Sequence, residues 1–259
     1  MVGAGMTRFA KQPERTFKQL AADAAAVTLD DAGRDAPPPD ACYFANAAAG
    51  SITGQEMLAG EFALFPQRVG GIPIYNVENA CASASTAFHL AWQAVAAGFS
   101  DRALAIGVEK MTHPDKARSF AAIAGAVDVD TVPPDPPADR SYLMDLYAQS
   151  AIDYMEASGA TREDLARVVI KNQRHGALNP YAQYGGELTV DDVLSGREIV
   201  WPFTLTMCAP ISDGAAGALL VGEDALNGRD GAIEVLASTL RSATPWDEAA
   251  PKVTAKISR

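Results

Sequence analysis

The hydrophobic period of the chain changes at Cys81, and this change is the feature that most restricts the fold. Residues 72–77 form a short apolar, partly β-branched run that predicts a strand. Residues 83–98 instead carry apolar side chains at helical spacing and end at a glycine. Cys81 is therefore expected where a strand passes into a helix, and the very small residues after it leave room beside the thiol for a second molecule.

A cysteine at the start of a helix has two possible roles. The unpaired N–H groups and the positive dipole end of a helix stabilise a thiolate, which makes Cys81 a candidate nucleophile. Free cysteine is also among the most buried residue types, so the position equally suits a structural cysteine on a tightly packed helix start. Geometry alone favours neither role.

Strands alternate with helices along the first half of the chain, and this alternation predicts a mainly parallel α/β sheet. The expected elements are a strand end with a glycine turn at 2–9, a helix over 16–31, an extended segment over 41–47, a helix over 55–65 and a buried strand over 102–109. Gly3 and Gly5 have a rival interpretation as a phosphate-binding loop, but they lack the later glycine of a dinucleotide fingerprint.

A proline-rich stretch at 128–140 is the expected domain boundary, because it cannot hold a helix or a central strand. Beyond it we expect helices over 142–156 and 161–172, a return to the sheet over 212–221 through a turn at Asp213-Gly214, and a further strand over 232–237. Thr161 opens the second helix with Asp164 at capping-box spacing.

Composition restricts the class of protein. The chain is 48% hydrophobic and 20% charged, with a formal net charge of −11, which argues against nucleic acid or an anionic membrane as partner. We expect neither a secretory leader nor a membrane span, and the cytoplasm is the expected compartment. Cys42, Cys81 and Cys208 are too few for a disulfide framework and lack the spacing of a zinc site, so no metal is expected.

Four segments, taken in order, resemble the thiolase superfamily. They are residues 76–87 around Cys81, residues 107–112, residues 171–181 and residues 207–216. The sequence is most similar to the sterol-carrier-protein-type and lipid-transfer-type thiolases, including the benzylsuccinyl-CoA thiolase group. The resemblance implies that Cys81 is the acyl-accepting nucleophile, that coenzyme A is a substrate and that no cofactor stays bound.

The resemblance also implies a division of the chain. The family has two similar α/β halves with a loop domain inserted in the first. This predicts an N-terminal α/β half over 1–115, a substrate-side loop domain over 116–204, a return to the first half over 205–228, and the start of a truncated C-terminal half over 229–259. The second half's catalytic Asn or His motif, its Gly-His-Pro histidine and its acid–base cysteine have no counterpart in the chain.

A polar group near the end of the 161–172 helix is the second candidate site. It consists of Arg174, His175, Asn179 and Tyr181. The resemblance implies that these side chains face the acyl-CoA, whereas a simple alternative is that Arg174 and His175 interact with the helix dipole. Gln173 stands where many relatives have histidine.

Other polar residues are expected to be structural. Cys42 and Cys208 are interpreted in this way, Glu109 and Lys110 are expected to form an ion pair, and Asp213 either caps a turn or orients a catalytic group. His89 is expected to be packed or on the surface, His113 to lie in a loop, and Lys171 to be solvated or to pair with coenzyme A phosphates.

Three functions remain open. The first is a thiolase-type acyltransferase that cleaves a 3-oxoacyl-CoA through an acyl-cysteine at Cys81, inactive as this chain alone. The second is a retro-aldolase subunit of the kind found in steroid side-chain degradation, and the third is a non-catalytic subunit. The resemblance further implies a homodimer through the sheet near Cys81 and a small zinc-ribbon and OB-fold protein as partner.

Overall fold

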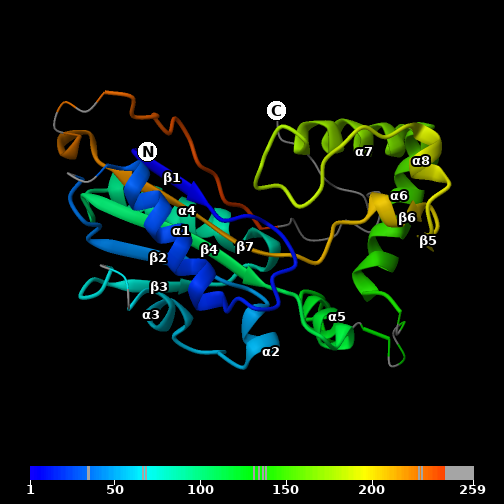
Figure 1. Cartoon of the computed structure of the whole chain (residues 1–259), viewed down its shortest axis with the longest axis horizontal. Coiled ribbons are helices and arrows are strands. Elements are labelled where there is room, and N and C mark those ends of the chain that lie inside the picture. The colour runs from blue at the N-terminus through cyan, green and yellow to red at the C-terminus, as the bar shows by residue number, and fades with distance from the viewer. Residues whose placement is uncertain are drawn as a thin grey trace. The chain divides into compact units, whose positions relative to one another are not determined.

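A computed structural model describes residues 1–33, 36–65, 67, 69–130, 132–133, 135, 137, 139–226, 228 and 230–242. The chain divides into two compact units (Figure 1). Unit 1 is formed by residues 1–119 and 211–241, and unit 2 mainly by residues 120–210. Thr131, Pro134, Pro136 and Ala138 of the expected proline-rich boundary lie outside the described residues.

Unit 1 is built on a five-stranded sheet with the order β1-β7-β4-β2-β3. Its strands are β1 (Gly3–Met6), β2 (Ala41–Ala45), β3 (Ile74–Val77), β4 (Arg102–Lys110) and β7 (Asp213–Val221). β2 is parallel to β3 and β4, whereas β7 is antiparallel to β4 and β1. Four of these five strands therefore run in the same direction, as the sequence predicts, and β7 runs opposite to them. The reason is the connection through unit 2: the chain leaves β4 at Lys110 and re-enters opposite it, at Asp213.

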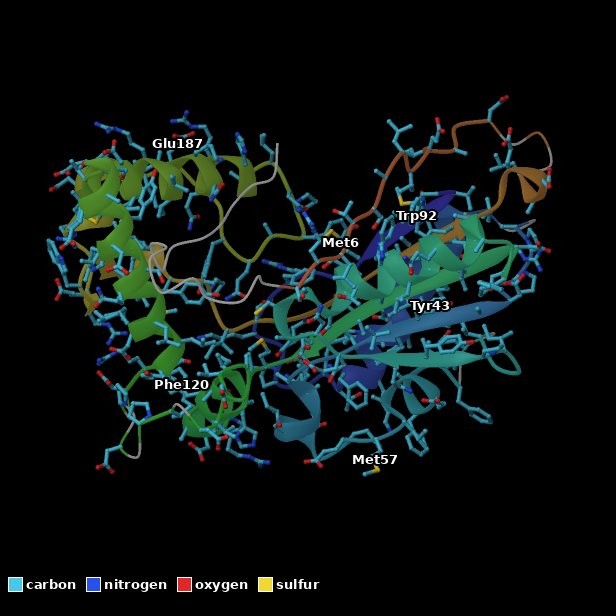
Figure 2. All side chains as sticks on the ribbon, turned by 180° about the vertical axis from the view of Figure 1, so that it is seen from behind. Met6, Tyr43, Met57, Trp92, Phe120 and Glu187 are labelled. Carbon is cyan, nitrogen blue, oxygen red and sulfur yellow. The ribbon has the colours of Figure 1, made fainter. Side chains whose placement is uncertain are left out.

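Helices cover both faces of this sheet (Figure 1). α1 (Phe17–Asp31) packs on one face, and α4 (Ser83–Ala96) packs on the other. Successive side chains of β4 alternate between them, with Leu104 and Ile106 in the α1 core and Ala103 and Ala105 in the α4 core. Figure 2, seen from behind, labels Trp92 of α4 and Tyr43 of β2 on the α4 side.

The N-terminal glycines are part of a strand rather than a turn. Gly3 and Gly5 lie in β1, and a Cβ added at Gly3 would come within 2.4 Å of the Thr28 carbonyl oxygen of α1. Close packing of α1 therefore explains the glycines, and the phosphate-loop interpretation is wrong for this segment. Thr16 begins α1 with a complete capping box, as the expected helix over 16–31 requires.

Three further expectations need correction. The helix predicted over 55–65 is shorter, because only α3 (Ala59–Leu64) falls within that range. A separate helix, α2 (Ala49–Thr53), precedes it, and Gly54 and Leu58 between the two adopt positive φ values of 84° and 54°. Residues 232–237 form no strand, although Ile233 exchanges two backbone hydrogen bonds with Met1, at 2.7 and 2.9 Å. Asp213-Gly214 begins β7 and is not a turn.

Unit 2 is largely helical. α5 (Lys116–Ala124) begins in unit 1 and ends in unit 2. It is followed by α6 (Tyr142–Ser158), α7 (Arg162–Gly176) and α8 (Val190–Leu194). A small antiparallel pair consists of β5 (Glu198–Val200) and β6 (Phe203–Thr204). Thr161 and Asp164 form the predicted capping box of α7. Among the described residues, none of the helices combines the length and hydropathy needed to cross a bilayer.

Candidate functional site

Cys81 lies on an elbow between β3 and α4. It is the middle residue of a 3₁₀ turn (Ala80–Ala82) that leads directly into Ser83, the first residue of α4. The Cys81 side chain is exposed. Ala80 has a φ of 46°, a left-handed conformation that residues other than glycine rarely adopt without support from their surroundings.

Side chains of the elbow hold this backbone in place. The Glu78 carboxylate accepts the Ala80 N–H at 2.6 Å, and the Ser83 hydroxyl donates to the Ala80 carbonyl at 2.7 Å. The Ser83 hydroxyl also accepts the Asn79 N–H at 2.8 Å, and the Asn79 side-chain amide donates to the Thr86 hydroxyl at 2.9 Å. The elbow is therefore fixed by hydrogen bonds on both sides of Cys81.

A glycine in β4 brings α4 close to the sheet. A Cβ added at Gly107 would lie 2.5 Å from the Cβ of Ala84, which is in the first turn of α4. Only a residue without a side chain fits there. The small residues after Cys81 thus serve close packing of the helix start, as well as access to the thiol.

The three cysteines differ in accessibility. Cys42 of β2 is fully buried, and burial, with the nearby charge of Glu61, raises the pKa of its thiol to about 12. Cys208 is partly buried, its thiol donates to the Thr204 carbonyl at 3.4 Å, and burial raises its pKa. Cys81 is the exposed one. A second molecule thus reaches Cys81 more easily than the other two thiols.

Glu109, at the end of β4, lies near the elbow but does not pair with Lys110. Its carboxylate accepts the N–H groups of Ala47, at 2.5 Å, and Ala48, at 3.2 Å, just before α2. Burial raises the Glu109 pKa, the nearby charge of Glu78 adds to the rise, and the amide hydrogen bonds oppose it. The predicted ion pair fails because successive strand residues point to opposite faces.

Lys110 pairs instead with Asp213, the first residue of β7. The Lys110 ammonium lies 2.6 Å from the Asp213 carboxylate, and both side chains are buried. That carboxylate also accepts the Thr112 hydroxyl and three backbone N–H groups, those of Gln12, Met111 and Thr112, at 2.8 to 3.0 Å. Burial tends to raise the Asp213 pKa, but these hydrogen bonds outweigh it and lower the value. With its oxygens so engaged, Asp213 acts as a structural carboxylate.

The second candidate group lies in unit 2, around the C-terminus of α7. Its four members, Arg174, His175, Asn179 and Tyr181, are all exposed. The Arg174 guanidinium contacts the Glu187 carboxylate at 3.3 Å, and the Asn179 side-chain oxygen accepts the Tyr181 N–H at 2.9 Å.

The segment after α7 folds back onto the helix end. The Gly186 N–H donates to the Gln173 carbonyl at 3.0 Å. A Cβ added at Gly185 would come within 2.3 Å of the Ala177 nitrogen, so the chain can pass this closely only at a glycine. The polar group therefore stands on a closed and well-supported turn.

The remaining histidines have local partners. His89 of α4 is buried, with its Nδ1 2.9 Å from the Ser238 hydroxyl. His113 is partly exposed in the loop after β4, where its Nδ1 accepts the Asp115 N–H at 3.0 Å. Within the described part of the chain, His, Cys, Asp and Glu side chains form no group of three or more that could hold a metal ion.

Sequence reasoning missed the residues that support the elbow. Glu78 and Asn79 lie just before Ala80 and Cys81, and Asn79 and Ser83 are residue types that signal a helix start, although neither the 3₁₀ turn nor α4 has a side-chain cap here. Glu109 offered no such signal, because its amide partners are 61 and 62 residues away in the sequence.

A cavity of about 260 Å³ opens beside the elbow, at the carboxyl ends of β2 and β3, and Glu78 is among its lining residues.

Comparison with known proteins adds a family to this geometry. A family model described as thiolase, N-terminal domain, matches residues 1–192. The benzoylsuccinyl-CoA thiolase subunit BbsB of Thauera aromatica is 35% identical over 246 residues, which cover 93% of this chain and 60% of that protein. Sterol carrier protein 2 of Gallus gallus is 31% identical over 95% of this chain and 45% of that protein.

The fold is also shared with a solved structure. The structure described as the Ltp2-ChsH2(DUF35) aldolase matches with a TM-score of 0.64 and 24% identity, over 88% of this chain and 56% of that chain. The present chain thus spans about half the length of the relatives it matches.

Proposed function

The chain belongs to the thiolase family, and from this premise we propose that Cys81 is the acyl-accepting nucleophile of a thiolase-type acyltransferase. The observation that carries the proposal is the exposed thiol of Cys81 on a left-handed elbow at the start of α4. A thiolate both attacks a carbonyl and leaves again, which acyl transfer between thioesters requires.

The proposed reaction cleaves a 3-oxoacyl-CoA with coenzyme A. The Cys81 sulfur attacks the keto carbon, and the bond between that carbon and the neighbouring methylene breaks. The acyl group stays on sulfur as a thioester, while the leaving carbanion takes a proton and departs as the shortened acyl-CoA. The thiol of a second coenzyme A then attacks the acyl-cysteine and returns the Cys81 thiol.

The start of α4 supplies part of the electrostatics. Negative charge develops on the carbonyl oxygen during the attack, and N–H groups aimed at that oxygen stabilise it. The Cys81 N–H makes no hydrogen bond within the described residues, so it is free to serve as one such donor. The positive end of the α4 dipole favours the same charge.

The polar group of unit 2 is proposed to bind the coenzyme A ester. The Arg174 guanidinium is exposed, and its Glu187 partner is exposed too, so a phosphate can replace that carboxylate at little cost. His175, Asn179 and Tyr181 offer further exposed polar groups beside it. A His175→Ala variant in a complete assembly should then raise the KM for the ester, and an unchanged kcat/KM would leave His175 with its helix-dipole role alone.

The proposal includes partners. β3 is an edge strand of the described sheet, and exposed strand edges pair readily with another chain, so we expect a second copy to pair there. The name of BbsB describes a subunit, and that of the solved aldolase joins two proteins, which supports a further polypeptide such as a zinc-ribbon and OB-fold protein. Light scattering of the purified chain should show an oligomer, and a clean monomer would contradict this. The cytoplasm remains the expected compartment.

A retro-aldolase is the second candidate, favoured by the structural match to the aldolase. Such a reaction forms no acyl-cysteine, and the two candidates therefore differ at Cys81. A non-catalytic subunit would need neither the exposed thiol nor its supported elbow, and it is the least favoured of the three.

Formation of an acyl-enzyme tests the proposal without requiring full turnover. The chain is incubated with acetyl-CoA, and mass spectrometry of the intact protein and its peptides locates any acetyl group. We expect an acetyl thioester on Cys81 that free coenzyme A removes; it should form unchanged in Cys208→Ala and be absent in Cys81→Ala. A protein that stays unmodified alone and with its partner, or Cys81→Ala with full activity, would reject the nucleophile.

The same proposal limits the activity of the chain alone. Loss of one oxyanion donor typically lowers turnover by about 10²–10³-fold. Loss of general acid–base groups lowers it by roughly another 10²–10⁴-fold. Because the family's second half supplies these groups, the purified chain should form the acyl-enzyme slowly and show no measurable multiple-turnover thiolysis.

A further inference from the structure

We infer that Glu78 is a positioning residue that holds the Cys81 elbow in its left-handed conformation through the Ala80 N–H. The inference rests on the proposed role of Cys81 and adds to it the residue that fixes where the thiol stands. Glu78 itself need not touch the substrate. Its part is to select one backbone conformation for the residue before the nucleophile.

The backbone of Ala80 shows why support is needed. A φ of 46° is disfavoured for alanine, because its Cβ approaches the backbone in the left-handed region. Both polar groups of the Ala80 peptide backbone bond to side chains of the elbow: its N–H to Glu78 at 2.6 Å, and its C=O to Ser83 at 2.7 Å. These side-chain bonds, together with the backbone bond from the Ser83 N–H to the Ala80 carbonyl, therefore support this conformation.

The two supporting bonds differ in kind. Ser83 belongs to α4 and is buried, so it ties Ala80 to the helix. Glu78 precedes the elbow and is exposed, and its side-chain oxygen accepts the Ala80 N–H from the strand side. Glu78 thus fixes the strand side of the elbow and Ser83 the helix side.

The negative charge of Glu78 does not itself favour a thiolate at Cys81. A carboxylate near a thiolate disfavours the charged sulfur, so charge alone would act against the proposed nucleophile. A second carboxylate, that of Glu109, is close enough for Glu78 to raise its pKa. The benefit of Glu78 is therefore its hydrogen-bond acceptor, and an uncharged acceptor of the same length should replace it.

This reasoning separates three substitutions. Glu78→Ala removes the acceptor, whereas Glu78→Gln keeps an oxygen at the same distance and removes only the charge. Ala80→Gly in the Glu78→Ala background removes the strain instead, because glycine adopts positive φ about as readily as negative φ. Glu56→Ala is the matched control, since Glu56 lines the same cavity but makes no hydrogen bond to the elbow among the described residues.

The experiment measures the rate of Cys81 alkylation by iodoacetamide in the folded full chain, by peptide mapping at several pH values. Without the Glu78 acceptor, the strain of Ala80 at positive φ should lower the fraction of molecules with this elbow conformation about tenfold. Glu78→Ala should therefore slow alkylation about tenfold. Glu78→Gln should react at the wild-type rate or faster, Glu78→Ala/Ala80→Gly should recover most of the loss, and Glu56→Ala should match the wild type.

A Glu78→Ala rate equal to that of the wild type would overturn the inference, and so would a double variant as slow as Glu78→Ala. A Glu78→Gln rate as low as that of Glu78→Ala would also reject the acceptor argument. Circular dichroism of each variant checks that it is folded. Failure of the proposed function looks different, because Cys81 then forms no acetyl thioester while these alkylation rates still report on the elbow.

Discussion

Glu109 and Asp213 are carboxylates one register position apart on neighbouring strands, yet their surroundings are opposite. Lys110 pairs with Asp213 across β4 and β7, and Glu109 pairs with Gly214. Asp213 has a buried ammonium 2.6 Å away and a lowered pKa. Glu109 has backbone amides as its hydrogen-bond partners, another carboxylate nearby and a raised pKa.

The difference distinguishes a structural part of unit 1 from the part around the candidate site. Asp213 joins the N-terminal segment at Gln12, the end of β4 and the start of β7, where the chain leaves for unit 2 and returns. Glu109 holds the short segment before α2, on the side where Glu78 supports the Cys81 elbow. The Asp213 carboxylate stabilises the fold because it pairs with a buried cation. The Glu109 carboxylate, bound to backbone amides, can take up a proton without breaking such a pair.

The largest effect should come from removing Asp213. An Asp213→Ala variant leaves the Lys110 ammonium buried without its partner and strips hydrogen bonds from Gln12, Met111 and Thr112. Breaking a buried ion pair in this way typically costs about 3–5 kcal/mol in the free energy of unfolding. Urea unfolding followed by circular dichroism would measure it.

Asp23→Ala is the matched control for that loss. Asp23 pairs with Arg15 on the surface of α1, and its side chain is 58% exposed. Exposed pairs contribute about 0–1 kcal/mol, so this variant should unfold near the wild-type urea concentration. Equal losses in the two variants would remove the distinction between the Asp213 site and an ordinary surface pair.

A smaller effect on stability is expected at Gly107, where β4 packs against the start of α4. Gly107→Ala places a methyl group 2.5 Å from the Ala84 Cβ, so α4 must move away from β4. Overpacking of this kind typically costs about 1–3 kcal/mol, and here it should also slow Cys81 alkylation. Gly222→Ala is the control, because a Cβ there meets its nearest neighbour at an ordinary 3.8 Å. If both variants alkylate alike, the position of α4 does not govern Cys81.

The smallest effects should appear in the pH dependence, with opposite signs. The Asp213 pKa is lowered by folding, so its contribution is present above its unfolded pKa of about 3.9 and is lost as the pH falls through the folded value. The stability gap between the wild type and Asp213→Asn should therefore narrow on acidification.

Glu109 should behave in the reverse manner. Its pKa is raised by folding, so its contribution is complete below the unfolded value of about 4.3 and is lost as the pH rises through the folded value. Relative to Glu109→Gln, the wild type should thus weaken as the pH rises. Urea midpoints measured from about pH 3 to about pH 7, a range that spans these reference pKa values, would test the sign of the pH dependence for both carboxylates. Parallel profiles for the two variants would contradict the comparison.

Local patterns in the sequence determined much of unit 1 and the helices of unit 2. The capping-box spacing of Thr161 and Asp164 predicted the start of α7, because a cap acts on amides two or three residues away, and helical spacing over 16–31 predicted α1. The change of period at Cys81 likewise predicted the elbow. Each of these features depends on neighbours in the chain, and the sequence displays such neighbours directly.

The tertiary structure alone decided which distant residues meet. Asp213 and Lys110 are 103 positions apart, so sequence reasoning paired Lys110 with its neighbour Glu109 instead. β1 pairs with β7 across more than two hundred positions, for example Gly3 with Leu219, and this pairing turned an expected glycine turn into a strand. Such contacts form only when separate segments pack together, because burial and charge pairing depend on distance in space and leave no periodic signal along the chain.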